Sequence, residues 1–194
     1  MTRSSFAGTR LAWYCTATLA VLTHAGHPVA VQSQIEQPVS ARELGAIWDA
    51  EHVSPPLPPL IDHVELVKRL DELGKRAPTA FAIEKIGESI EGRSIHHVGA
   101  GTGPMPVLLW SQMHGDESSA TSALFDLFEY LQRHRQEPVV TRILSRLTLH
   151  VVPMLNPDGA ERFERRNAQS IDINRDALRL QTPEGRVLKA LRDR

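Results

Sequence analysis

Apolar residues recur along this chain with two spacings that predict different elements. Helical spacing, with apolar side chains every three or four positions, marks several segments that begin at capping residues or end at glycine or proline. These predicted helices cover residues 41–51, 62–74, 118–135, 139–144 and 184–194. Short apolar runs predict strands at residues 81–86, 95–98, 107–110 and 147–155. Because strands alternate with helices, the pattern predicts a layered α/β domain.

Two of the predicted strands are expected to lie at the centre of the sheet. The run from Val107 to Trp110 is continuously apolar, which predicts a strand buried on both faces. The run from Leu147 to Leu155 predicts a second buried strand. The glycine-rich segment 99–106 is not a phosphate-binding loop, because no Gly-Lys-Ser/Thr sequence follows it.

The N-terminal residues have the pattern of a targeting segment followed by a spacer. Two arginines flank a polar start, the short apolar run 11–22 follows, and small residues lead up to Ala30. We interpret residues 1–30 as a signal peptide, which predicts a secreted or periplasmic protein. A disordered leader or a retained anchor is the alternative, although the run is too short for a stable membrane span of ~20 residues. Residues 31–59, rich in proline and glutamine, are expected to be a linker, and the globular domain is expected at 60–194.

Composition excludes several classes of function. The 22 Lys and Arg residues nearly balance the 23 Asp and Glu residues, so the net charge is −1. Such a balance gives no general attraction for nucleic acid, and we predict no nucleic-acid partner. The single cysteine, Cys15, excludes an internal disulfide framework and a zinc site built from several thiolates.

A possible metal-binding motif follows the first central strand. In His114-Gly-Asp-Glu117, an imidazole and a carboxylate are two residues apart, with a glycine that permits a sharp turn. Such a pair can supply two of the three protein ligands of a catalytic zinc ion. The alternative is a helix-capping turn, in which the two acidic residues sit at the positive end of the next helix.

A second polar cluster follows the second central strand. It contains Asn156-Pro-Asp-Gly159, then Arg165-Arg-Asn167, then the segment 172–176. From Arg162 onward there are nine Lys and Arg against five Asp and Glu, which predicts a basic surface that can hold an anionic group. The alternative is a turn followed by a solvated, charged helix.

Taken in order, these two clusters resemble those of the zinc metallocarboxypeptidases of the carboxypeptidase A and B type. The stretch from Ile86 to Arg93 (IGESIEGR) also resembles the segment that leads into that catalytic domain. The resemblance covers residues 81–176. It implies a mixed central sheet with helices on both faces, one Zn²⁺ ion, and hydrolysis of the C-terminal peptide bond of a peptide or protein substrate.

The resemblance also implies a role for each motif residue. His114 and Glu117 would be zinc ligands, and Asp172 would orient His114 through its other ring nitrogen. Arg165 would stabilise the oxyanion of the tetrahedral intermediate. Asn174 and Arg175 would hold the free C-terminal carboxylate of the substrate. The residues Asn156, Asp158 and Gly159 are expected to shape the turn.

The chain departs from this family in one respect. The family's third zinc ligand, a histidine, and its general base, a glutamate, lie downstream of the Asn-Arg pair, whereas this sequence has no histidine after His150. We expect His134 and His150 to be ordinary surface or core histidines. The sequence is therefore expected to be the N-terminal part of such a domain, truncated at its C-terminus, with weak metal binding and negligible hydrolysis of its own.

Three alternatives stay open at this point. Relatives that begin with the same His-x-x-Glu motif act on cell-wall peptides or on acylated amino acids, so the chain could be a zinc amidohydrolase of that kind. A non-catalytic module that binds peptides through the carboxylate clamp is the second hypothesis. An unstable fragment with unpaired strands is the third.

Overall fold

A computed structural model describes residues 40–54 and 60–194. The predicted signal peptide and most of the predicted linker lie outside the described residues. The helices are α1 (Ala41–Glu51), α2 (His63–Arg76), α3 (Ser119–Arg133), α4 (Pro138–Arg146), α5 (Pro157–Arg162), the 3₁₀ helix η1 (Ile173–Arg175) and α6 (Pro183–Arg192). The strands are β1 (Ala82–Glu88), β2 (Ser94–Ala100), β3 (Met105–Trp110) and β4 (Leu147–Val152).

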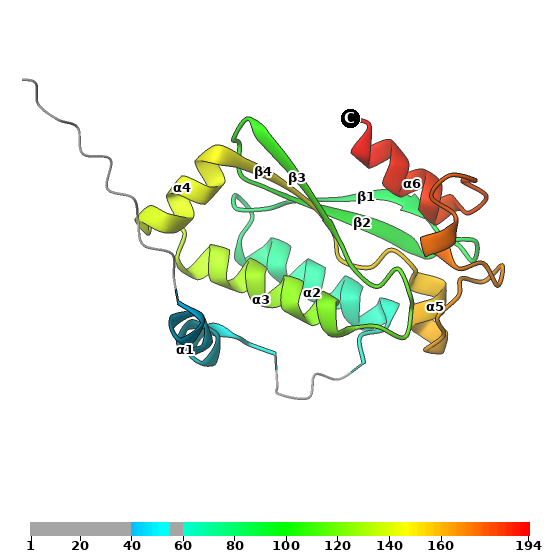
Figure 1. Cartoon of the computed structure of the whole chain (residues 1–194), viewed down its shortest axis with the longest axis horizontal. Helices are drawn as coiled ribbons and strands as arrows, with labels where there is room; N and C mark the ends of the chain where they lie inside the picture. Colours follow the sequence, from blue (N-terminus) through cyan, green and yellow to red (C-terminus); the bar gives the residue numbers. More distant parts are fainter. Residues whose placement is uncertain (1–39, 55–59) are drawn as a thin grey trace, which may run out of the picture. The chain divides into compact units, whose positions relative to one another are not determined.

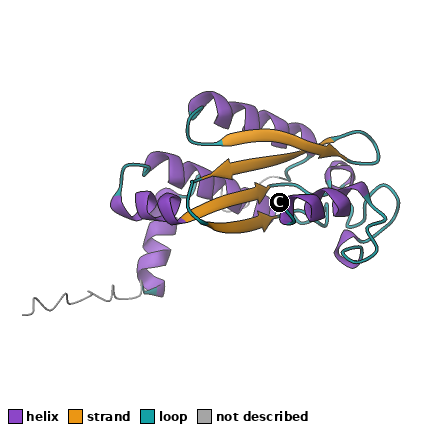
Figure 2. Cartoon of the chain, turned by 90° about the horizontal axis from the view of Figure 1, so that it is seen from above, coloured by secondary structure: helices purple, strands orange, loops and turns teal. Residues whose placement is uncertain are grey.

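The four strands form one mixed sheet in the order β1-β2-β4-β3 (Figure 2). Strand β2 is antiparallel to both β1 and β4, whereas β3 and β4 are parallel, with Leu108 opposite His150. Parallel neighbours need a crossover connection, and here helices α3 and α4 supply it. Because β3 and β4 are parallel, the C-terminal ends of both strands lie at the same end of the sheet.

Helices cover both faces of the sheet, as expected (Figure 1). On one face, α2 and α3 bury a core that includes Leu66, Phe128 and Val151. On the other face, α6 packs against β1 and buries Leu191 with Val152. Both layers exclude water from apolar side chains, which is the main contribution to the stability of such a fold. The predicted α/β class with a mixed central sheet is confirmed.

Strand β3 differs from its prediction. It pairs only with β4 among the described strands, so it lies at the edge of the sheet. Its residues are half-buried or exposed, and the Trp110 side chain is 46% exposed. The expectation of a strand buried on both faces is therefore wrong for these residues, because apolar composition alone does not distinguish an edge strand from a central one.

The capping signals explain where several helices begin. The Asp62 side chain accepts a hydrogen bond from Glu65 N at 2.8 Å at the start of α2. Ser40 forms a reciprocal capping box with Glu43 at the start of α1, which spans the predicted range. None of the helices in residues 40–54 and 60–194 is long and apolar enough to cross a membrane.

Candidate active site

The parallel pair β3 and β4 brings the two polar clusters together. The pairing continues past the strand ends, because Ser111 N donates to Val152 O at 3.0 Å and Asn156 N donates to Gln112 O at 3.0 Å. The turn with His114 therefore lies beside the turn that starts at Asn156. Ligand sites in α/β sheets commonly form where strand ends meet in this way.

His114 is held between two carboxylates. Its Nδ1 lies 3.1 Å from Glu117 Oε1, and its Nε2 lies 3.1 Å from Asp172 Oδ1. The imidazole is only 10% exposed, whereas Glu117 is 62% exposed. A neutral imidazole can donate to only one of the two carboxylates. The other nitrogen and its carboxylate oxygen then present lone pairs to each other, so the site needs a proton or a metal ion between them.

Arg165 completes this cluster of charges. Its two terminal nitrogens contact Glu117 Oε1 at 3.3 Å and Asp172 Oδ2 at 3.2 Å. The guanidinium is about half exposed, so its face remains accessible from solvent. One arginine thus spans the two carboxylates that hold His114, which offsets part of their negative charge.

The environment of Asp172 favours its ionised form. Burial raises the pKa of the Asp172 carboxyl, but the hydrogen bonds from His114 and from the Asn174 backbone outweigh it. The charge of Arg165 acts in the same direction, so the pKa lies below its ordinary value. An ionised Asp172 can only accept a hydrogen bond, so a neutral His114 that donates its Nε2–H to Asp172 keeps Nδ1 as an electron-pair donor.

Asn174 and Arg175 lie on η1, directly after Asp172. The backbone N–H of Asn174 donates to Asp172 Oδ1 at 3.0 Å. Its side chain lines an open hollow of about 500 Å³ together with His114 and Glu117. The Arg175 side chain is exposed and makes no hydrogen bond or ion pair within the described residues. The structure thus brings Asn174 to the site, whereas the guanidinium of Arg175 is exposed and has no hydrogen-bond or ion-pair partner among the described residues.

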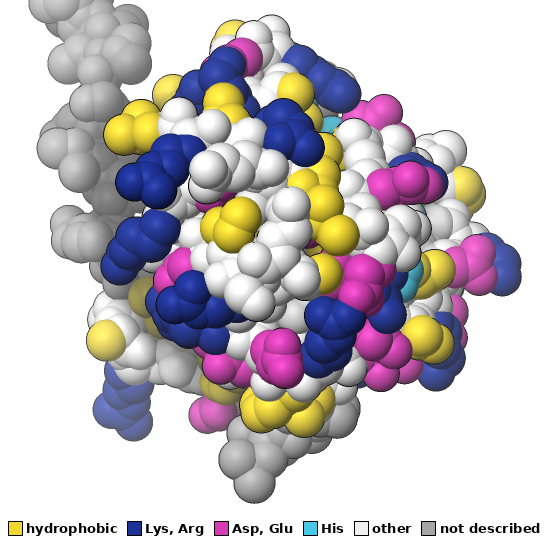
Figure 3. Space-filling model, turned by 90° about the vertical axis from the view of Figure 1, so that its right-hand side faces the viewer, with side chains coloured by type: hydrophobic (Ala, Val, Ile, Leu, Met, Phe, Trp, Pro, Cys, Tyr) yellow, Lys and Arg dark blue, Asp and Glu magenta, His cyan; other side chains and the backbone are white. Residues whose placement is uncertain are grey.

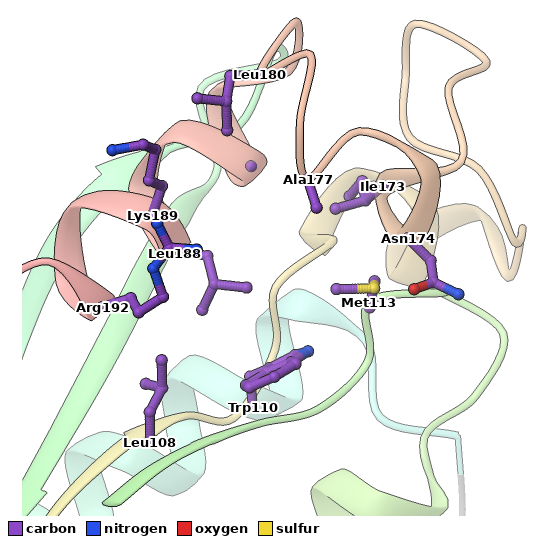
Figure 4. Close-up of a pocket in the computed structure, with 11 residues that line it drawn as sticks. Leu108, Trp110, Met113, Ile173, Asn174, Ala177, Leu180, Leu188, Lys189 and Arg192 are labelled. Atoms are coloured by element: carbon purple, nitrogen blue, oxygen red, sulfur yellow. The ribbon is translucent and has the colours of Figure 1, made fainter. Parts of the chain in front are cut away.

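An apolar pocket of about 210 Å³ adjoins the hollow (Figure 4). Trp110, Met113 and Asn174 line both cavities, so the two share a wall. Leu108 and Leu188 extend the apolar lining toward α6.

The basic surface expected after Arg162 is neutralised in part. Arg162 and Arg93 both pair with Glu91, and Arg165 pairs with Glu117 and Asp172. Figure 3 looks onto the end of the domain that carries α5 and α6, where basic and acidic side chains are interspersed. The surplus of basic residues in the sequence therefore does not form a continuous basic patch on this face.

The segment Asn156–Gly159 is more than a turn. Asn156 caps the short helix α5 by accepting a hydrogen bond from Gly159 N at 2.9 Å. Asp158 is fully buried and accepts from Ser89 Oγ at 2.6 Å and from Arg93 at 2.8 Å. Asp158 thereby links the β1–β2 turn to the site, a contact between segments far apart in the sequence.

Gln112 supports the His114 turn, a role that no motif or spacing in the sequence indicated. Its backbone has a positive φ of 47°, a conformation that costs energy for a residue other than glycine. Its buried side chain donates to Gly115 O at 3.0 Å and to Ile61 O at 2.9 Å. It also accepts from Thr121 Oγ1 at 2.8 Å, so one amide fixes three segments around the turn.

His134 and His150 make contacts of their own. His134 lies between Glu51 and Glu137, at 2.9 Å and 2.7 Å. His150 Nδ1 lies 3.0 Å from His97 Nε2, and the two rings stack.

The donor set therefore fits a zinc ion in part. His114 Nδ1 and Glu117 Oε1 lie next to each other, and the contact with Asp172 orients the imidazole. Within the described residues, no group of three or more His, Cys, Asp and Glu side chains is arranged to hold a metal ion. A catalytic zinc ion takes three protein ligands, and these residues can supply at most two of them.

Solved structures share this fold. A metallo-carboxypeptidase from Burkholderia cenocepacia superposes with a TM-score of 0.60 and 23% identity, covering 66% of this chain and 36% of that one. Carboxypeptidase A from Helicoverpa armigera superposes with a TM-score of 0.55 and 19% identity, covering 75% of this chain and 46% of that one. At these identities, the likeness establishes the fold.

Sequence comparisons give the family. Carboxypeptidase SOL1 of Arabidopsis thaliana is 28% identical over 119 residues, covering 58% of this chain and 24% of that protein. Carboxypeptidase M of Mus musculus is 29% identical over 111 residues, covering 48% of this chain and 25% of that protein. The chain thus spans about a quarter of the length of these relatives. The family model for zinc carboxypeptidases matches residues 66–180, and the chain therefore belongs to the zinc carboxypeptidase family.

Proposed function

We propose that the protein is a zinc metallocarboxypeptidase that removes the C-terminal residue of a peptide or protein. The observation that carries this proposal is the position of His114 between Glu117 and Asp172, at 3.1 Å from each. An imidazole fixed by one carboxylate and facing another is the arrangement that a metal ion stabilises.

In this proposal, His114 and Glu117 hold one Zn²⁺ ion. When bound, the ion polarises the scissile carbonyl and acidifies a water molecule. Asp172 keeps the proton of His114 on Nε2, so that Nδ1 remains free to bind. Because the described residues supply two ligands, we expect the 194 residues alone to bind zinc weakly and to hydrolyse peptides negligibly.

Arg165 and η1 would act on the substrate. The half-exposed guanidinium of Arg165 lies beside Glu117, where its N–H groups can donate to a developing oxyanion. Asn174 lines the hollow. The next residue, Arg175, is exposed and makes no ion pair within the described part of the chain, so its guanidinium is a forked donor available to a carboxylate. A free C-terminal carboxylate is thus the substrate feature that we expect these residues to recognise.

A pair of matched peptides tests this recognition. Binding of an N-dansyl tripeptide with a free C-terminal carboxylate is compared with binding of its C-terminal amide, by fluorescence anisotropy. We expect the free acid to bind about tenfold more tightly, and Arg175→Ala to abolish the difference. Equal affinity for acid and amide in the unchanged protein would contradict the carboxylate clamp.

The same peptides separate the remaining functional hypotheses. Because we expect negligible hydrolysis by these 194 residues, the readout is binding: for a zinc carboxypeptidase, added Zn²⁺ tightens binding of the free-acid peptide and 1,10-phenanthroline reverses this effect. A zinc amidohydrolase for cell-wall peptides or acylated amino acids shows the same dependence on zinc with its own substrate class and not with the tripeptide. A non-catalytic peptide-binding remnant binds the free acid whether or not the chelator is present.

We also propose that the protein is secreted or periplasmic. The support is the sequence of residues 1–30, with basic residues before a short apolar run and small residues after it. If this is correct, N-terminal sequencing of the protein from its native host would show that the chain has been cleaved at or near Ala30.

A further inference from the structure

We propose that Glu184 is a positioning residue that acts through Asn167 to hold Arg165 and Asp172 in place. Glu184 lies in the first turn of α6 and is fully buried. Its Oε2 accepts a hydrogen bond from Asn167 Nδ2 at 3.2 Å. The inference rests on the proposed function, in that Arg165 and Asp172 are the residues whose placement matters for it.

Asn167 organises the segment between α5 and η1, which we call the 163–172 loop. Its Oδ1 accepts from Gln169 N and from Ile171 N, both at 3.0 Å. Its backbone N–H donates to Ile171 O at 3.1 Å, and its carbonyl accepts from Ser170 N at 2.8 Å. Asn167 follows Arg165 by two residues, and Ile171 directly precedes Asp172. The asparagine therefore closes a ring between the two site residues.

The hydrogen bonds fix which way the Asn167 amide points. Two backbone N–H groups face one atom of the amide, so that atom is the oxygen, and the NH₂ group faces Glu184. Asn167 is 3% exposed, so water cannot readily take the place of a missing hydrogen-bond acceptor. Glu184 is thus the acceptor that keeps the amide in the orientation the loop requires.

The buried position of Glu184 is unfavourable in itself. Burial raises the pKa of the Glu184 carboxyl, and the charge of Asp158 raises it further. The Asn167 amide and the backbone N–H groups of Glu184 and Ile90 lower it in part. A buried carboxyl group is stabilised by the hydrogen bonds that it accepts, so the loss of the contact with Asn167 should be costly.

The loop has a second attachment that does not involve Glu184. Asn156 Nδ2 donates to Arg165 O at 3.3 Å. The start of the loop is therefore attached to the N-cap of α5, and its middle is attached to α6. Removing Glu184 should loosen the segment around Asn167 without detaching Arg165 from Asn156.

Amide hydrogen exchange on the metal-free protein tests this inference. In Glu184→Leu, which lacks an acceptor, we expect the amides of Gln169 and Ile171 to exchange about tenfold faster. Glu184→Gln keeps an acceptor for Asn167, and its exchange should stay within about threefold of the unchanged protein. Zinc affinity should follow the same order, falling several-fold only in Glu184→Leu.

Thr182→Ala is the matched control. Thr182 caps the same helix, with Oγ1 accepting from Gly185 N at 3.0 Å, and within the described residues its side chain hydrogen-bonds to Asp176 and Gly185 rather than to Asn167. This variant weakens α6, yet the Gln169 and Ile171 amides should keep their exchange rates. If Thr182→Ala and Glu184→Leu accelerate these amides equally, Glu184 is merely structural and the inference is wrong.

Two further readouts keep the result interpretable. If Glu184→Leu does not fold, the side-chain NH₂ signals of Asn167 are followed in the unchanged protein, and exchange as fast as that of an exposed asparagine would overturn the inference. The amide readout uses no metal, so it is independent of zinc binding. If the Gln169 and Ile171 amides exchange slowly in Glu184→Gln but fast in Glu184→Leu, and the protein does not bind zinc at His114, the inference is supported and the proposed function is contradicted.

Discussion

The backbones of Gly115 and Gly159 touch, and through them the two polar clusters of the chain are in direct contact. A Cβ atom on Gly115 would overlap the carbonyl carbon of Gly159 and the amide nitrogen of Ala160. Among the described glycines, positive φ angles belong to Gly92 and Gly101. Gly115 is therefore required for this close approach, and not for the sharp turn that the sequence suggested.

We predict that Gly115→Ala separates the two turns and destabilises the protein by about 3 kcal/mol, because packed backbone cannot yield to the added methyl group. Urea denaturation measures the change. Gly45 is the control, since in the exposed helix α1 no atom outside the adjacent helix backbone lies within 4 Å of its Cβ position. There, alanine should stabilise the protein by roughly 0.5 to 1 kcal/mol. If Gly115→Ala, like Gly45→Ala, did not lower the free energy of unfolding, the close contact between Gly115 and Gly159 would be contradicted.

Asp172→Asn is expected to weaken zinc binding without unfolding the protein. The amide no longer fixes the proton of His114 on Nε2, and loss of such a partner typically costs about 10- to 100-fold in metal affinity. Competition with a chromophoric chelator measures the affinity. Asp193→Asn, on the exposed end of α6, serves as control and should bind zinc as the unchanged protein does. Equal loss in both variants would point to a general charge effect.

Stability should fall on acidification because of His97. Burial lowers the pKa of His97, and the neighbouring His150 and Arg194 lower it further, while Glu84 acts in the opposite direction. Since the unfolded state then binds the proton more readily, the free energy of unfolding should decrease as the pH falls below the ordinary value of 6.5.

Urea denaturation between pH 8 and pH 5 measures this dependence. In His97→Gln the decrease should be smaller, although His96, whose pKa burial also lowers, keeps part of it. The difference between the two curves isolates His97. Curves that run parallel across this range would show that His97 has the same pKa in the folded and unfolded states.

Ser170→Gly should stabilise the 163–172 loop. Ser170 has a φ of 60°, and its side chain is exposed, so the substitution removes strain and little else. We expect a gain of roughly 0.5 to 1 kcal/mol, since the left-handed conformation costs other residues about 1 kcal/mol or more and glycine's greater freedom when unfolded offsets part of the gain. The melting temperature measures it, and a decrease would mean that the serine hydroxyl has a role in the fold.

Much of the fold could be predicted from the sequence, because periodicity and capping residues are local signals. The helix at 41–51 and the strands around residues 82–88, 94–100 and 147–152 formed near their predicted ranges. The edge position of β3 could not be predicted, since it depends on pairing between distant segments. Helix α3 shows the same limit, because its polar residues Ser122 and Asp126 are buried together with Phe125.

For the candidate site, the sequence indicated the residues of the motifs but not the residues that support them. The motifs indicated His114, Glu117, Arg165 and Asp172, and the structure joins these four side chains in one cluster, in which both carboxylates contact His114 and Arg165. The supporting residues gave no such signal. Gln112 and Glu184 are polar residues whose burial depends on contacts with segments far along the chain, and neither periodicity nor spacing reports such contacts.

The central claim is that His114 and Glu117 bind one zinc ion together, and an NMR titration of the histidine ring signals with zinc tests it most directly. We predict that zinc shifts the His114 signals, that the shift saturates, and that Glu117→Gln weakens binding by about tenfold or more. His150→Gln, which removes the separate His97–His150 pair, should leave this titration unchanged. Zinc that shifts the His97 and His150 signals while leaving His114 unchanged would contradict the account.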